Sequence, residues 1–156
     1  MYTETLTQRK ALMNGVPPQT ANGLGYQTNA VDMGAGKSQR AFFHVQFGAT
    51  VGGTVKLSLQ ESADNSTWPA TGTASAFSGS GGNNTQITLA PPVANKEYTL
   101  ECKAEDLSSG KRYVRLDINV SANNNLLSAT AEGDEAQHKP NSLLNDTNIS
   151  TQNVVS

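Results

Sequence analysis

Residues 34–38, Gly-Ala-Gly-Lys-Ser, come nearest in this chain to a motif that performs chemistry, because they match the last part of a phosphate-binding loop. That loop also requires a glycine five positions before Gly36, where this chain has Val31, and a following helix whose N-terminal amides hold the phosphates. A strand-like stretch from Arg40 follows instead. We therefore predict an exposed turn between strands and expect no nucleotide or other cofactor.

Residues that commonly ligate metals or act as nucleophiles are few and scattered. His44 falls on the polar side of a strand-like stretch and His138 lies far away in the C-terminal region, which is not a metal-ligand pattern. Cys102 is the only cysteine, so no internal disulfide is expected, and its apolar phase in a strand predicts a buried, unreactive thiol. The chain also lacks the Gly-x-Ser-x-Gly elbow of serine hydrolases.

Acidic residues offer the remaining material for catalysis. A glycosidase needs two carboxylates that face one another. A calcium loop needs regularly spaced oxygen ligands, and these are missing after Asp64. The other carboxylates lie on predicted strand faces and turns, where we expect them to be solvated. We therefore predict a protein that is not an enzyme and holds no metal. The carboxylates in question are Glu61, Glu101, Asp106 and Asp117.

Trp68 follows a predicted turn at residues 64–66, where Asx side chains bond nearby amides. Two interpretations of this single tryptophan are open. It is either a platform on which a sugar ring stacks or a core residue that folds back over the sheet edge. In a chain with little apolar material a lone tryptophan more often belongs to the core, so we favour burial.

The elements that must position these residues are β-strands. Three stretches alternate apolar and polar residues with the period of two that places one set on one strand face. The first two, at residues 40–47 and 54–60, are separated by a glycine-containing loop and predict an antiparallel hairpin. The third spans residues 112–120. The apolar sets are Ala41, Phe43, Val45 and Phe47; Val55, Leu57 and Leu59; and Val114, Leu116, Ile118 and Val120.

Shorter strands are predicted at residues 26–33, 85–89 and 98–103, with turn signals between them. Short strands at this spacing are typical of an all-β sandwich or barrel. N-terminal to these strands, residues 3–13 predict a short helix that ends before Pro17. After Val120 the sequence shows no helical or strand periodicity in its apolar residues. The predicted organisation is an N-terminal arm (1–25), an antiparallel β-sandwich domain (26–122) and an extended C-terminal arm (123–156).

Composition narrows the function classes. The net charge is −2 without a basic cluster, which argues against nucleic-acid binding, and no apolar run is long enough to span a membrane. The N-terminus lacks the basic and apolar regions of a signal peptide, so we expect synthesis in a reducing cytoplasm. Hydrophobic residues make up only 36% of the chain, which predicts a thin core and packing of some segments on a partner.

Four short stretches in a fixed order resemble capsid decoration (cement) proteins of tailed bacteriophages, over about residues 31–120. The resemblance implies a jelly-roll-like fold, a homotrimer on the capsid surface of the virion, the major capsid protein as partner, and no catalytic residues. The stretches are residues 31–33 (Val-Asp-Met), 40–43 (Arg-Ala-Phe-Phe), 59–64 (Leu-Gln-Glu-Ser-Ala-Asp) with Trp68, and 111–115 (Lys-Arg-Tyr-Val-Arg).

A decoration protein stabilises the head by binding across neighbouring capsid subunits, and large apolar side chains in the predicted arms are the candidates for these contacts. The alternative function is a ligand- or receptor-binding β-sandwich module of a phage tail or fibre. Burial of Trp68 and Tyr113 would favour decoration, and exposed aromatic residues on one face would favour the alternative. The candidate contact residues are Leu12, Val16, Leu24, Leu126, Leu127, Leu143, Leu144 and Ile149.

Overall fold

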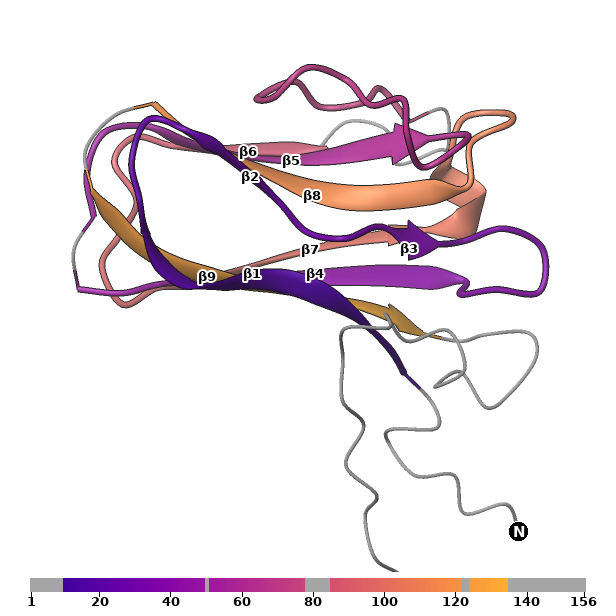
Figure 1. The fold of residues 1–156 in the computed structure, drawn as a ribbon, viewed down its shortest axis with the longest axis horizontal. Coiled ribbons are helices and arrows are strands. Elements are labelled where there is room, and N and C mark those ends of the chain that lie inside the picture. Colours follow the sequence, from indigo (N-terminus) through magenta and orange to yellow (C-terminus); the bar gives the residue numbers. More distant parts are fainter. Residues whose placement is uncertain (1–9, 50, 78–84, 122–123, 135–156) are drawn as a thin grey trace, which may run out of the picture.

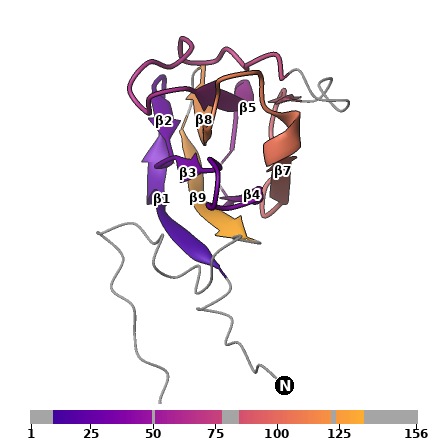
Figure 2. The same cartoon turned by 90° about the vertical axis from the view of Figure 1, so that its right-hand side faces the viewer.

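The structure, a computed structural model, describes residues 10–49, 51–77, 85–121 and 124–134. Nine strands within these residues form two antiparallel sheets that pack face to face (Figure 1 and Figure 2), so the predicted β-sandwich is confirmed. Sheet I has the order β1 (Ala11–Ala21), β9 (Asn125–Asp134), β4 (Arg40–Phe47) and β7 (Glu97–Lys103). Sheet II has the order β2 (Gly25–Gln27), β8 (Tyr113–Val120), β5 (Val55–Ser62) and β6 (Gln86–Leu89), and β3 (Val31–Asp32) also pairs with β8.

The core between the sheets is built from the apolar faces that the alternation predicts. Every residue of the three predicted apolar sets is buried, and Phe43 is fully buried at the centre of sheet I. Within the described ranges the one helical element is η1 (Ala104–Asp106), a short 3-10 helix between β7 and β8. Strand type and inward face are therefore confirmed for β4, β5 and β8.

The predicted hairpin between residues 40–47 and 54–60 is wrong. β4 pairs with β7 and β9 in sheet I, whereas β5 pairs with β6 and β8 in sheet II. The connection between them crosses from one sheet to the other. An alternating pattern shows that one face of a strand is buried, but it does not identify the neighbouring strand. Here both apolar faces point into the same core from opposite sides.

The predicted N-terminal arm is wrong over β1. This strand lies at the edge of sheet I and pairs with β9, so the predicted helix at residues 3–13 is also wrong at its C-terminal end. Pro17 and Pro18 lie inside the strand, within a register shift between Val16 and Gln19. Proline cannot donate to the ladder, and an edge strand with bulges tolerates it. Residues 1–9 lie outside the described part.

The predicted C-terminal arm is wrong over β9, which lies between β1 and β4 in sheet I. Its buried face has Leu127 as its one large apolar side chain and small residues at 129, 131 and 133, which is a weak strand signal. Close packing requires the glycine at 133, because a Cβ there would lie 2.3 Å from Ser38 Oγ; it also requires Gly15 on the neighbouring β1, where a Cβ would lie 2.0 Å from Ala129 O. Residues 135–156 lie outside the described part.

The strand directions give the sandwich two distinct ends. The connections β1–β2, β4–β5, β6–β7 and β8–β9 meet at one end, which we call the loop end (left in Figure 1). Ala11 pairs with Gly133 at the opposite end, so the chain enters β1 and leaves β9 at neighbouring points. We call this the terminal end; it faces the viewer in Figure 2.

Phe43 and Phe42 make a matched pair for testing the core. Phe43 is fully buried, whereas Phe42 is half-buried on the outer face with Lys10 Nζ 6.0 Å from its ring centroid. We expect Phe43→Ala to lower the free energy of unfolding by about 3–5 kcal/mol because it leaves a cavity, and Phe42→Ala by about 1 kcal/mol. Urea unfolding measures both, and equal losses would contradict the assigned inward face of β4.

Cys102 gives a second test of the core. Burial, with smaller contributions from Asp106 and Glu101, raises the pKa of its thiol to about 12. We expect the native thiol to be inert to a disulfide reagent at pH 8 and to react after unfolding. An unfolded thiol loses its proton near pH 9, while the folded one keeps it up to about pH 12, so this group lowers stability as pH rises between those values. Rapid labelling of the native protein would contradict this assignment.

Candidate functional site

A loop covers the outer face of sheet II, beside β5 and β8 (Figure 1). We call residues 63–77 the covering loop. The fully buried Gln60 on β5 holds it, because Gln60 Nε2 donates to the carbonyl oxygens of Ala70 at 3.0 Å and Thr73 at 2.8 Å. Pro69 O lies at 3.4 Å from the same nitrogen. The outer face of β5 is therefore buried by polar contacts.

Two carboxylates that were expected to be solvated are buried instead, so that expectation is wrong for them: Asp117 holds the covering loop, and Glu61 holds the connection between β7 and β8. Asp117 is fully buried and accepts hydrogen bonds from Gln27 Nε2 at 2.6 Å and Gly72 N at 2.7 Å. Glu61 is buried and accepts from Ser108 N at 2.9 Å. Both side chains connect loops to the sheet. The expectation fails because residue type alone does not show whether a loop covers a strand face.

The predicted turn at residues 64–66 is confirmed and begins the covering loop. Asp64 Oδ1 accepts hydrogen bonds from Thr67 N at 2.8 Å and Ser66 N at 2.9 Å. These backbone hydrogen bonds lower the pKa of the Asp64 carboxyl well below its usual range. Asn65 has a φ of 60°, a left-handed conformation that asparagine tolerates better than most residues. The turn directs the chain back over β8 and places Trp68.

Trp68 does not belong to the core, so the favoured interpretation of burial is wrong. It is half-buried, and the Arg115 guanidinium lies 4.3 Å from its ring centroid, the distance of a cation–π contact. Arg115 donates from Nε and Nη2 to Gln60 Oε1, at 3.0 and 2.9 Å. Gln60 therefore fixes both the covering loop and the cation on which the indole lies.

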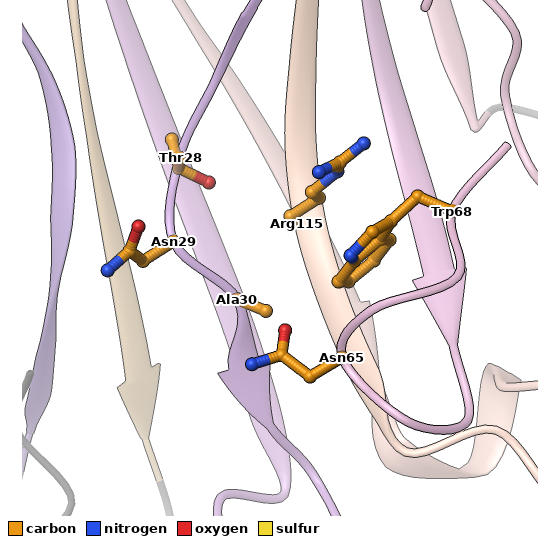
Figure 3. Close-up of a pocket in the computed structure, with 6 residues that line it drawn as sticks. All are labelled: Thr28, Asn29, Ala30, Asn65, Trp68 and Arg115. Carbon is orange, nitrogen blue, oxygen red and sulfur yellow. The ribbon is translucent and has the colours of Figure 1, made fainter. Parts of the chain in front are cut away.

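An open cleft of about 350 Å³ lies beside this pair. Figure 3 shows the segment between β2 and β3 along one side and Trp68 on the other, with Arg115 between them. No local sequence pattern predicts the contribution of that segment, because its proximity to β8 depends on sheet pairing. The lining residues are Thr28, Asn29, Ala30, Asn65, Trp68 and Arg115.

The glycine-rich stretch at residues 34–38 is a turn between β3 and β4, as predicted, with Lys37 N donating to Gly34 O at 2.9 Å. A Cβ added at Gly34 would lie 2.9 Å from Nε of Arg112, whose guanidinium pairs with both carboxylate oxygens of Asp32. Packing against this ion pair explains the glycine at position 34.

The histidine and cysteine positions do not converge. His44 lies on the outer face of sheet I with Nε2 3.1 Å from Glu97 Oε2, and Cys102 is buried in the core as predicted. Within the four described ranges, no group of three or more histidine, cysteine, aspartate or glutamate side chains is placed to hold a metal ion. His138 lies outside those ranges.

The candidate contact residues divide into buried and exposed groups. Val16 and Leu127 are buried in the sandwich core, so the prediction that they contact a partner is wrong. Leu12 is half-buried on β1. Leu24 and Leu126 are exposed. Leu143, Leu144 and Ile149 lie outside the described residues.

Leu24 and Leu126 belong to segments at the loop end, as does a third exposed residue, Val93, which the sequence did not single out. Their exposed fractions are 63%, 41% and 57%, and they are all the exposed large hydrophobic side chains of the described chain. Backbone hydrogen bonds through Gly48 link Leu126 on β9 to the connection that carries Val93: Gly48 N donates to Leu126 O at 2.8 Å, and Asn95 N donates to Gly48 O at 3.1 Å. We call Leu24, Val93 and Leu126 the apolar tip.

No protein-family model matches this chain, and a search of curated proteins finds no similar sequence. In the described residues no helix has the length and apolar character needed to cross a membrane. The fold and the two surface features, the apolar tip and the cleft, therefore carry the functional argument.

Replacing Gln60 tests how the covering loop is held. Gln60→Ala would leave Arg115 without its acceptor and two loop carbonyls without a donor, so we expect the free energy of unfolding to fall by more than about 2 kcal/mol. The matched control is Gln46→Ala on the exposed face of β4, with an expected loss below about 0.5 kcal/mol. Urea unfolding gives both values, and the fluorescence of the single tryptophan reports the loop. A Gln60 variant with unchanged stability and emission would contradict this role.

Proposed function

We propose that this protein is a non-enzymatic structural protein that decorates and stabilises a bacteriophage capsid, with the major capsid protein as its partner. The apolar tip is the observation that carries the proposal. Single exposed hydrophobic residues are ordinary on protein surfaces, but here all three of the described chain belong to segments at the same end of the sandwich. Such a group is typical of a surface that docks on another protein.

The binding free energy that one apolar tip can supply is small, which favours attachment through several copies of the tip. Each large apolar side chain that becomes fully buried contributes about 1.5–3 kcal/mol. Three such side chains do not give tight binding once the loss of translational and rotational freedom is subtracted. A homotrimer presents the same tip three times and raises the effective concentration of the second and third contacts. The proposal therefore includes a homotrimer on the virion surface, after synthesis in the host cytoplasm.

The two ends of the sandwich support binding across neighbouring subunits. The apolar tip lies at the loop end, whereas residues 1–9 and 135–156 are connected to the chain at the terminal end. Eight-residue strands such as β4 separate the two ends by about 26 Å, at about 3.3 Å per residue. The apolar tip is thus well separated from the points at which the terminal segments join the sandwich.

The second candidate function is a ligand- or receptor-binding module of a phage tail or fibre. A specific observation favours it: Trp68 and Tyr113 are both half-buried and both lie on the outer side of sheet II, with Trp68 beside the cleft. Burial of both was expected of decoration and exposure of the alternative, and half-burial meets neither criterion in full, so the cleft beside Trp68 is what favours the alternative. The two functions use different surfaces, so one protein can have both.

Capsids assembled without this protein test the first proposal. We expect the variant Leu24→Ser/Val93→Ser/Leu126→Ser to keep its β-sheet circular dichroism and to bind capsids at least about tenfold more weakly, since 1.4 kcal/mol corresponds to a factor of ten. Co-sedimentation measures binding, and light scattering of heated capsids measures protection. The matched control replaces exposed polar residues of sheet I, as Gln46→Ser/Thr99→Ser/Thr130→Ser.

A triple tip variant that binds and protects as well as the unchanged protein would exclude docking through the apolar tip. Deleting residues 135–156, which leaves β9 complete, separately tests the terminal segment. Light scattering of the free and bound protein tests the homotrimer against the chain mass of 16.4 kDa. If the full-length protein binds no capsid at all, the decoration function itself is wrong.

A further inference from the structure

Arg115 forms no ion pair with a carboxylate in the described part of the chain, although the charge of Asp117 on the same strand acts on it. Arg40 and Arg112 each form an ion pair with a carboxylate. Arg115 instead donates to the neutral Oε1 of Gln60, and its Nη1 nitrogen makes no hydrogen bond to any described residue. Donors of a charged group therefore remain available beside the cleft.

The acidic side chain nearest to Arg115 along β8 is already engaged. Asp117 accepts from Gln27 Nε2 with one oxygen and from Gly72 N with the other. Partial burial lowers the pKa of Arg115, but a guanidinium stays charged at neutral pH. A partly desolvated cation with unused donors favours an anion, and the planar guanidinium matches the two oxygens of a carboxylate.

The other cleft residues indicate what carries this carboxylate. Trp68 lines the cleft with the Arg115 guanidinium 4.3 Å from its ring centroid, so a sugar ring whose carboxylate reaches Arg115 would lie beside the indole. Asn65, Asn29 and Thr28 carry amide and hydroxyl groups that suit sugar hydroxyls, and Ala30 is the one aliphatic residue of the lining. A volume of about 350 Å³ lies at the small end of ligand sites, of roughly 300–1,000 Å³.

We infer that this cleft binds one acidic monosaccharide unit of a glycan, with its carboxylate on Arg115, its ring against Trp68 and its hydroxyls toward Asn65 and the segment between β2 and β3. The inference supplies a ligand class for the second candidate function and rests on that function. It does not depend on docking through the apolar tip.

Calorimetric titration of the full chain with glucuronate, glucose and acetate tests the inference. We expect glucuronate to bind at least about tenfold more tightly than either glucose, which lacks the carboxylate, or acetate, which lacks the ring. The emission of the single tryptophan, Trp68, should change only with glucuronate. If glucose binds as well as glucuronate, the acidic class is wrong while the ligand-binding function stands. If acetate binds equally well, the site is an anion site and the inference fails.

Matched variants separate binding from folding. Arg115→Gln should abolish glucuronate binding, whereas Arg112→Gln, which removes the same charge from an arginine outside the cleft, should not. Asn65→Gly removes the cleft amide, and glycine keeps the φ of 60°; its control is Asn95→Gly, at a φ of 57° near the loop end. We expect weaker glucuronate binding for Asn65→Gly alone. Glucuronate binding that both Arg115→Gln and Asn65→Gly leave unchanged, or no binding by the unchanged protein, would overturn the inference.

Discussion

The outer half of the molecule depends on the buried side-chain amide of Gln60. A buried amide costs free energy unless its donors and acceptor are all engaged, and here the donors meet loop carbonyls while the oxygen accepts from Arg115. The same group thereby fixes the path of the covering loop and the orientation of a cation. Trp68 lies on that cation, so its position follows from Gln60 as well. Asp117 on β8 faces the same side and accepts from Gly72 N of the covering loop, so it adds a second polar attachment of that loop.

The sequence predicted the inward faces of β4, β5 and β8 because large apolar side chains at every second position are a local signal. It did not predict the strand partners, because pairing depends on residues distant in sequence. β5 was expected to pair with β4 and lies in the opposite sheet. β9 was missed for a second reason: its buried face is largely alanine and glycine, and close packing against Ser38 requires the glycine at position 133.

The candidate site was even less predictable. Trp68 was recognised as the residue with two open interpretations, and the structure places it at the surface beside Arg115. Gln60 and Arg115 occupy polar positions of alternating strands, where solvent exposure is the ordinary expectation. A loop that covers such a face reverses that expectation without changing the local pattern. The segment at residues 28–30 joins the cleft only because β2 and β3 both pair with β8.

The placement of the two surface features bears on how they would work together. The apolar tip lies where connections leave the strands, whereas Arg115 lies within β8 on the outer face of sheet II. The tip and the cleft share no residue. A protein that docks by its loop end therefore keeps the outer face of sheet II uncovered by that contact. The hydrogen bonds of Gln60 and Asp117 beneath the covering loop would then keep the geometry of the cleft unchanged whether or not the loop end is docked.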